Sequence, residues 1–209
     1  AIPKDNIELI FFKAENYKIA KRAEVLGELT NNIFTIAVAG THGKTTITSM
    51  VAHLLNSAEI AITSFIGGVA NNFNSNLVVN PNSQYMIVEA DEYDKSFLQL
   101  NPNIAIISSM DADHLDIYHD HNNLSQTFQS FAEKVTADGS IIIKHGLKIE
   151  ILKKIITYGI ADDAAIIADE INMENGKFNF RIRLANGQST HVKMLVPGRH
   201  NIENALAAT

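Results

Sequence analysis

One short segment combines the residue types that bind phosphate: two glycines, a lysine and neighbouring threonines. It follows a β-branched apolar run at residues 33–39 and reads Gly40-Thr41-His42-Gly43-Lys44-Thr45-Thr46. In a strand–loop–helix unit of this kind, backbone N–H groups and the helix N-terminus face a bound anion. Lys44 would add a positive charge and Thr45 a hydroxyl ligand for Mg²⁺. The segment therefore predicts a site for a nucleoside triphosphate.

The pattern is a shortened form of the usual phosphate loop, because the first glycine of the long form would fall at Val38. The alternative interpretation is an ordinary strand-to-helix turn that contains two glycines. The Lys44-Thr45 pair directly after the second glycine favours phosphate binding over that alternative.

Two further polar clusters follow apolar runs, and both contain acids. Glu89-Ala90-Asp91-Glu92 follows the run at 85–88, and Asp111-Ala112-Asp113-His114-Leu115-Asp116 follows the run at 104–108. Each cluster alone could be a solvated strand end. In a parallel α/β sheet, however, ligands bind beyond the carboxyl ends of the strands, so these clusters are expected to join the phosphate loop. We expect the runs 85–90 and 104–108 to be neighbouring strands.

The elements that must position these residues alternate between strand and helix, which predicts a doubly wound, mostly parallel α/β sheet of the P-loop NTPase type. Asn175-Gly176 and Asn186-Gly187 separate three extended runs, which predicts a small antiparallel meander near the C-terminus. An apolar run at 60–66 ends at Gly67-Gly68, and residues 71–76 are turn-prone. The remaining expected strands are 33–39, 85–90, 104–108 and 141–144. The three runs of the meander are 165–173, 177–184 and 189–196. The expected helices are 5–14, 21–29, 44–56, 122–134 and 147–154.

Composition restricts the class of protein. The chain has 209 residues and is 46% hydrophobic, so it can bury one substantial core. Its formal net charge is -6, whereas proteins that bind nucleic acids usually carry a positively charged surface. It contains no cysteine, and no apolar run approaches the roughly 20 residues that span a bilayer. We expect a cytosolic protein that binds neither nucleic acid nor membrane. The sequence leaves the oligomeric state open.

Four motifs together resemble the Mur ligases in kind, order and spacing. These are the phosphate loop, Glu89-Ala90-Asp91-Glu92, Asp113-His114-Leu115-Asp116, and Gly198-Arg199-His200-Asn201-Ile202-Glu203-Asn204-Ala205. Mur ligases are ATP-dependent, amide-forming enzymes of peptidoglycan synthesis. The resemblance implies that residues 1–30 are the end of an N-terminal UDP-sugar domain with its connector, and that 31–209 are the central ATP-binding domain. It also implies that the family's C-terminal domain is absent here.

The histidine inside the phosphate loop, together with the runs at 96–102 and 113–118, makes the chain most similar to the branch that joins L-alanine to UDP-N-acetylmuramate. The alternatives are the sibling that recycles a murein tripeptide, and a P-loop module that binds nucleotide without ligase activity. The resemblance implies ATP and Mg²⁺ as cofactors and a carboxylate activated as an acyl phosphate. It assigns the nucleotide to Gly40, Thr41, His42, Gly43, Lys44, Thr45, Thr46, Asn201 and Asn204, the metal to Thr45, Glu89 and His114, and catalysis to Lys44, Glu89 and His114.

Overall fold

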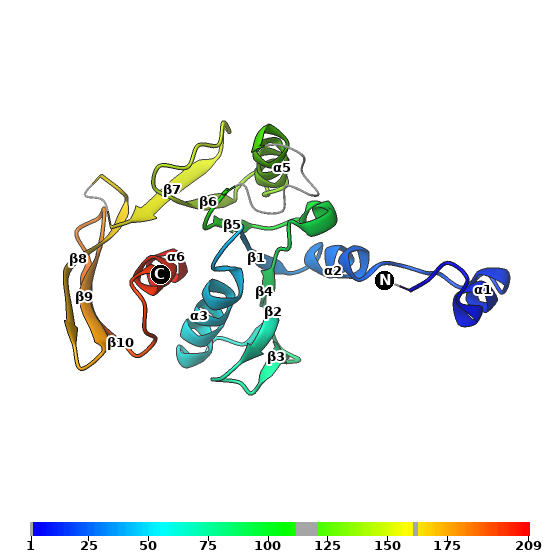
Figure 1. Cartoon of the computed structure of the whole chain (residues 1–209), viewed down its shortest axis with the longest axis horizontal. Helices are drawn as coiled ribbons and strands as arrows, with labels where there is room; N and C mark the ends of the chain where they lie inside the picture. The colour runs from blue at the N-terminus through cyan, green and yellow to red at the C-terminus, as the bar shows by residue number, and fades with distance from the viewer. Residues whose placement is uncertain (1, 112–120, 161–162) are drawn as a thin grey trace.

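The computed structural model describes residues 2–111, 121–160 and 163–209, and it folds most of them around one large sheet (Figure 1). The helices are α1 (Ile7–Ala14), α2 (Arg22–Thr30), α3 (Lys44–Ser57), the 3-10 helix η1 (Tyr93–Gln99), α5 (His121–Glu133) and α6 (His200–Ala208). The strands are β1 (Phe34–Ala39), β2 (Ile62–Ala70), β3 (Ser75–Val78), β4 (Tyr85–Glu89), β5 (Ile104–Ile107), β6 (Ser140–Lys144), β7 (Lys154–Gly159), β8 (Ile166–Glu174), β9 (Lys177–Leu184) and β10 (Ser189–Met194).

The sheet has ten strands in the order β10-β9-β8-β7-β6-β5-β1-β4-β2-β3. The strands from β8 to β2 pair in parallel, while β3, β9 and β10 pair antiparallel. The expected fold class and the C-terminal meander are therefore confirmed. At the first meander turn both Asn175 (φ 51°) and Gly176 (φ 74°) have positive φ, which is the backbone geometry that Asn-Gly favours in tight hairpins.

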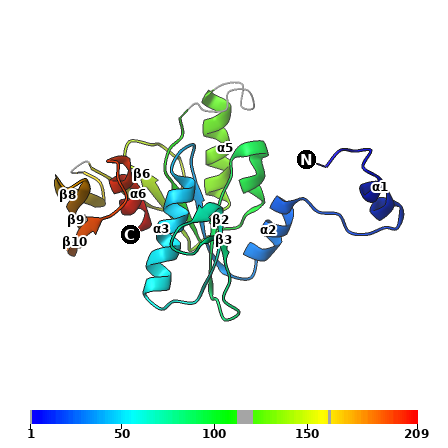
Figure 2. The ribbon, with the colours of Figure 1, turned by 60° about the horizontal axis from the view of Figure 1, so that its bottom comes forward.

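Helices cover both faces of the sheet because successive residues of its central strands point to opposite sides. In β1, Ala37 and Ala39 face the core beneath α5 and η1, whereas Val38 faces the core beneath α3 and α6. Figure 2 shows these two groups of helices on opposite sides of the strands. Continuous apolar strands such as 104–107 are the consequence, since neither face meets water.

The strand order corrects one expectation. β4 and β5 are not neighbours, because β1 lies between them and pairs with both, Val38 opposite Glu89 on one side and Ile106 on the other. Buried strands of equal apolarity do not reveal their order, which depends on where each crossover helix packs. The phosphate loop therefore leaves the sheet between the carboxyl ends of β4 and β5.

The helix expected at 147–154 is wrong. Leu147, Ile149 and Ile151 pack against the core that includes α5, while Leu152 is fully exposed. Apolar contacts at every second residue fit an extended chain, and the segment leads into β7, which pairs in parallel with β6. The sequence also did not predict η1, β7 or β3, nor that β2 continues through the glycines at 67 and 68 to pair antiparallel with β3.

The first two helices differ in how they contact the sheet domain. α1 has no buried residue and lies apart from the other elements in both views (Figures 1 and 2). α2 packs against η1, where a Cβ on Gly27 would lie 2.4 Å from the Gln99 carbonyl oxygen. The Thr30 hydroxyl also accepts a hydrogen bond from the Asn101 N–H at 3.2 Å. Within the described residues, no helix is long and apolar enough to cross a bilayer.

Candidate active site

The phosphate loop joins the centre of the sheet to α3. Gly40 (φ 136°) and Gly43 (φ 84°) both lie in the region of positive φ that favours glycine, and Gly43 is the N-cap of α3. A Cβ at Gly40 would lie 2.2 Å from the Ser108 hydroxyl, so this position also needs glycine for space. The loop turns sharply enough to direct the α3 N-terminus at the space beyond β1, as the sequence pattern predicts.

Two serines at the end of β5 fix the shape of this loop, and they are not among the site residues expected from the sequence. The Ser108 hydroxyl donates to the His42 carbonyl and also lies 3.2 Å from the Ala39 carbonyl. The Ser109 hydroxyl accepts from the His42 N–H at 2.8 Å and shares a hydrogen bond of 2.9 Å with Thr41. Hydroxyls that directly follow an apolar strand are the signal that could have identified them.

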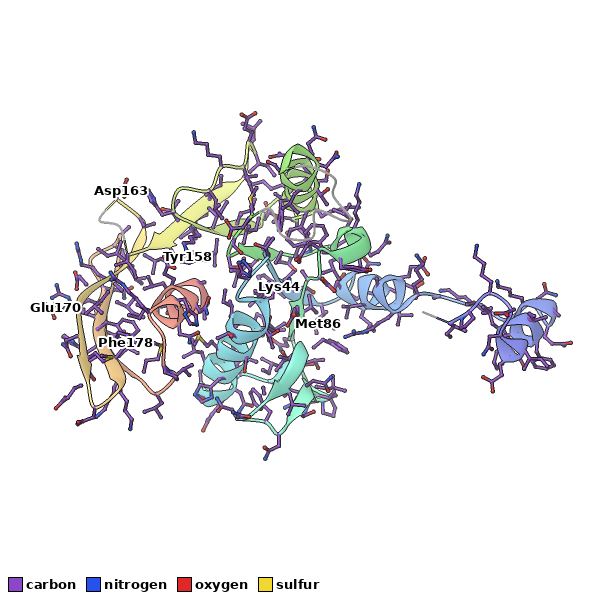
Figure 3. All side chains as sticks on the ribbon, viewed as in Figure 1. Lys44, Met86, Tyr158, Asp163, Glu170 and Phe178 are labelled. Carbon is purple, nitrogen blue, oxygen red and sulfur yellow. The ribbon has the colours of Figure 1, made fainter. Side chains whose placement is uncertain are left out.

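The Lys44 ammonium points inward from the first turn of α3 (Figure 3). It donates to the Gly40 carbonyl at 2.8 Å and to the two carboxylate oxygens of Glu92 at 2.9 and 2.7 Å. The Glu92 side chain is 1% exposed and that of Lys44 15%. The sequence analysis placed Glu92 in the acidic cluster but did not pair it with Lys44, because that pairing depends on the turn between β4 and η1.

Glu89 and Thr45 both border the two glycines of β2. The Gly67 N–H donates to the Glu89 carboxylate at 2.8 Å, and a Cβ on Gly67 would lie 2.3 Å from that carboxylate. A Cβ on Gly68 would lie 3.6 Å from the Thr45 methyl group. The Thr45 hydroxyl and the Glu89 carboxylate supply the oxygen ligands that Mg²⁺ prefers.

The two asparagines of α6 reach the phosphate loop from the far end of the chain. A Cβ on Gly43 would lie 2.8 Å from the Asn204 side-chain oxygen, so this amide packs directly on the loop. Asn204 donates to the Asn201 side chain at 2.9 Å, and Asn201 donates to the Pro197 carbonyl at 2.6 Å. Both are buried. The structure thus brings Asn204 to the loop, with Asn201 behind it.

The remaining expected residues differ in what the structure says of them. The His42 side chain is 63% exposed, and its Nε2 lies 4.0 Å from the Asp111 carboxylate. His114, expected as a metal ligand, lies outside the described residues, as does the rest of its motif at 113–116. Among the residues that are described, no three His, Asp or Glu side chains converge as a metal site.

A cavity of about 690 Å³ begins at Thr45 and Thr46 and extends along α3. It lies between α3 and α6, and β10 with the residues that follow it forms another wall. Its lining combines apolar side chains such as Met50, Leu54 and Met194 with a few polar ones. Pockets of this size and character hold the apolar part of a small ligand while polar groups fix its orientation. The cavity therefore adjoins the phosphate loop as a nucleoside pocket would.

Comparison with known proteins agrees with this geometry. The family profile described as "Mur ligase middle domain" matches residues 38–209, from within β1 to α6. The chain belongs to the Mur ligase family. The match begins inside β1 and includes the phosphate loop, the acidic segment after β4 and both asparagines of α6.

Curated relatives within the Mur ligase family agree on one name. The chain is 42% identical over 208 residues to a protein of Christiangramia forsetii, and 44% identical to one of Flavobacterium psychrophilum, each named UDP-N-acetylmuramate--L-alanine ligase. Each match covers 100% of this chain and 45% of the relative. The chain therefore spans about half the length of these relatives.

Two solved Mur ligase structures are similar over almost the whole chain. A UDP-N-acetylmuramate-alanine ligase from Thermotoga maritima is 25% identical with a TM-score of 0.82, covering 100% of this chain and 48% of that one. The ligase of UDP-N-acetylmuramate with L-alanyl-gamma-D-glutamyl-meso-diaminopimelate from Neisseria meningitides is 26% identical with a TM-score of 0.84. That match covers 99% of this chain and 70% of the other.

Proposed function

We propose that the whole protein to which this chain belongs joins L-alanine to UDP-N-acetylmuramate at the expense of ATP. The observation that carries the proposal is a built phosphate loop in a chain 35–44% identical, over its full length, to relatives with that printed name. We further propose that residues 1–30 belong to a preceding UDP-sugar domain and 31–209 to the ATP-binding domain. Because the reaction consumes ATP, we propose that it takes place in the cytoplasm.

The proposed reaction has two steps. A carboxylate oxygen of UDP-N-acetylmuramate attacks the γ-phosphorus of ATP, ADP leaves, and an acyl phosphate forms. The amine of L-alanine then attacks the acyl carbon, inorganic phosphate leaves with the former carboxylate oxygen, and the nitrogen loses its extra proton. Negative charge on the transferring phosphoryl group is the main electrostatic problem, so positive groups that are already in position lower the barrier.

Residues of this chain at one edge of the sheet would stabilise the negative charge of the phosphates. The N–H groups of Gly43 and Lys44 and the start of α3 would hold the phosphates, and the Lys44 ammonium would neutralise the β- and γ-phosphates. Asn204, packed on Gly43, would orient the nucleotide side of the loop, with Asn201 supporting it. The cavity along α3 would take the nucleoside.

Thr45 and Glu89 are proposed to hold Mg²⁺, with His114 as a further ligand. The fit rests on the chemistry of the two side chains, a hydroxyl and a carboxylate, and on the glycine at 67, whose missing Cβ leaves room for the Glu89 carboxylate. A bound Mg²⁺ would supply positive charge next to the transferring phosphoryl group.

The test is a coupled assay for ADP release by the whole protein with ATP, UDP-N-acetylmuramate and an amino donor. Release that requires L-alanine, with the amide product identified by mass spectrometry, is the expected result. Release that requires L-alanyl-gamma-D-glutamyl-meso-diaminopimelate instead would assign the recycling activity, which the similarity to the Neisseria meningitides structure keeps as a second candidate. Phosphorylation of an acceptor without amide formation would contradict both.

A further inference from the structure

The Lys44 ammonium has all of its hydrogen-bonding capacity directed into the protein. An ammonium group has three N–H donors, and the structure gives it three acceptors within 2.9 Å: the Gly40 carbonyl and both oxygens of Glu92. In this arrangement Lys44 has no N–H left for a phosphate oxygen. Lys44 must therefore give up at least one of these contacts before it can bind a triphosphate.

Glu92 is the partner that a phosphate would compete with most directly, because it is also an anion. Its side chain is almost completely buried. A buried carboxylate depends on nearby positive charge and hydrogen bonds, so separating it from Lys44 costs free energy. That cost must be offset by the phosphates when nucleotide binds.

The backbone around Glu92 is fixed, so the carboxylate cannot simply follow the lysine. The Ala90 N–H donates to the Val38 carbonyl at 2.8 Å, and the Lys95 N–H donates to the Glu92 carbonyl at 3.0 Å. η1 then buries Phe97, whose ring stacks on Phe131 of α5 at a centroid distance of 4.6 Å. The flexible partner is the lysine, with its four-carbon stem.

We infer that Glu92 is a positioning residue for Lys44, which it holds through the contact described above and releases to the phosphate chain of a bound nucleotide. Breaking the Lys44–Glu92 contact then costs free energy that only a ligand with at least a β-phosphate can offset. The inference rests on the proposed function, because it takes ATP as the ligand. The chemical class that it selects is the nucleoside di- and triphosphate, against the monophosphate.

The experiment compares the unmodified protein with Glu92→Gln, which keeps the shape of the side chain and removes its charge. Calorimetric titration with ATP should give binding about tenfold tighter for Glu92→Gln, because a neutral amide competes less well for the ammonium than a carboxylate does. AMP affinity should not change. Glu174→Gln, at an exposed position in β8, is the control for the same change in net charge and should leave ATP affinity unchanged.

A second readout tests the contact without any nucleotide. Lys44 labelling by a small amine-reactive reagent, followed by mass spectrometry, should be slow in the unmodified protein and several times faster in Glu92→Gln. Glu92→Asp retains the charge on a shorter side chain and should give an intermediate rate, so that a folding defect in one variant does not remove the test. Thermal melts check that each variant is folded.

The inference is overturned if Lys44 labelling is equally fast in the unmodified protein and the folded variants. It is also overturned if ATP affinity is unchanged or weaker in Glu92→Gln, or if AMP affinity rises as much as ATP affinity. If labelling changes as expected but neither protein binds ATP, the proposed function fails, and with it the nucleotide part of this inference. The labelling result then shows separately that the Lys44–Glu92 contact itself is correct.

Discussion

At the residue scale, Lys44 is expected both to bind the phosphates of ATP and to stabilise the buried Glu92 carboxylate. Substitutions at Lys44 and Glu92 should distinguish these two roles. Lys44→Ala removes the positive charge of the loop, so ATP affinity should fall at least about tenfold. It also takes one partner from the buried Glu92 carboxylate, which should lower the free energy of unfolding by roughly 3–5 kcal/mol. The double variant Lys44→Ala/Glu92→Gln should recover stability without recovering ATP binding. Calorimetry and urea unfolding measure the two effects, and recovery of both together would contradict this division.

Tyr158 should make the fold sensitive to alkaline pH. Burial raises the pKa of its phenol, with a smaller contribution from the Glu203 carboxylate. The neutral phenol therefore stabilises the fold fully below the ordinary tyrosine pKa of about 10, and that contribution is lost as the pH rises beyond it.

Tyr158→Phe should accordingly lose less Tm than the unmodified protein between about pH 9 and about pH 11. Tyr17→Phe, at a position that is 61% exposed, is the matched control and should follow the unmodified protein. Parallel pH curves for all three proteins would contradict the role given to Tyr158.

At the scale of elements, β2 shapes the candidate metal site through a residue that has no side chain. Gly67→Ala would place a Cβ 2.3 Å from the Glu89 carboxylate, which must then move. Since the end of a glutamate is flexible, the fold should survive while Mn²⁺ affinity in the presence of ATP falls about tenfold. Gly68→Ala makes an ordinary contact of 3.6 Å with Thr45 and should have a smaller effect. Electron paramagnetic resonance of Mn²⁺ measures both, and equal losses would argue against the role of Gly67.

Local patterns predicted those elements whose formation depends on local chemistry. The turns of the phosphate loop at Gly40 and Gly43 and the meander turn at Asn175-Gly176 all require positive φ. Glycine and asparagine adopt positive φ more readily than other residues, so the sequence predicts these turns. The segment at 147–154 was misassigned because its short apolar run fits helix and strand alike until its alternating contacts with the core are seen.

Non-local arrangement was harder to predict. The insertion of β1 between β4 and β5 depends on how whole helices pack, and the pairing of Lys44 with Glu92 rather than with Glu89 depends on a turn of a few residues. The sequence placed these acids in the correct segment. It did not show which of them would face the lysine, because the chain leaves the regular strand alternation just before Glu92.

At the scale of the whole molecule, residues 1–209 should fold and bind ATP but should not form the amide. The chain spans about half the length of its curated relatives, and catalysis by proximity requires every substrate to be held. We expect no increase in phosphate release when L-alanine and UDP-N-acetylmuramate are added to the 209-residue chain with ATP. The whole protein under the same conditions is the control. Amide product from the 209-residue chain alone would contradict the prediction that this part of the protein is insufficient for ligation.

The contact between Asn204 and Gly43 joins two residues that are far apart in the sequence. A ribosome makes Gly43 long before it makes Asn204, so a nascent chain can form the loop while the helix that supports it does not yet exist. The candidate nucleotide site is therefore completed only after α6 has been made. Its completion, unlike that of β1 or α3 alone, marks a chain whose sheet has been made through to β10.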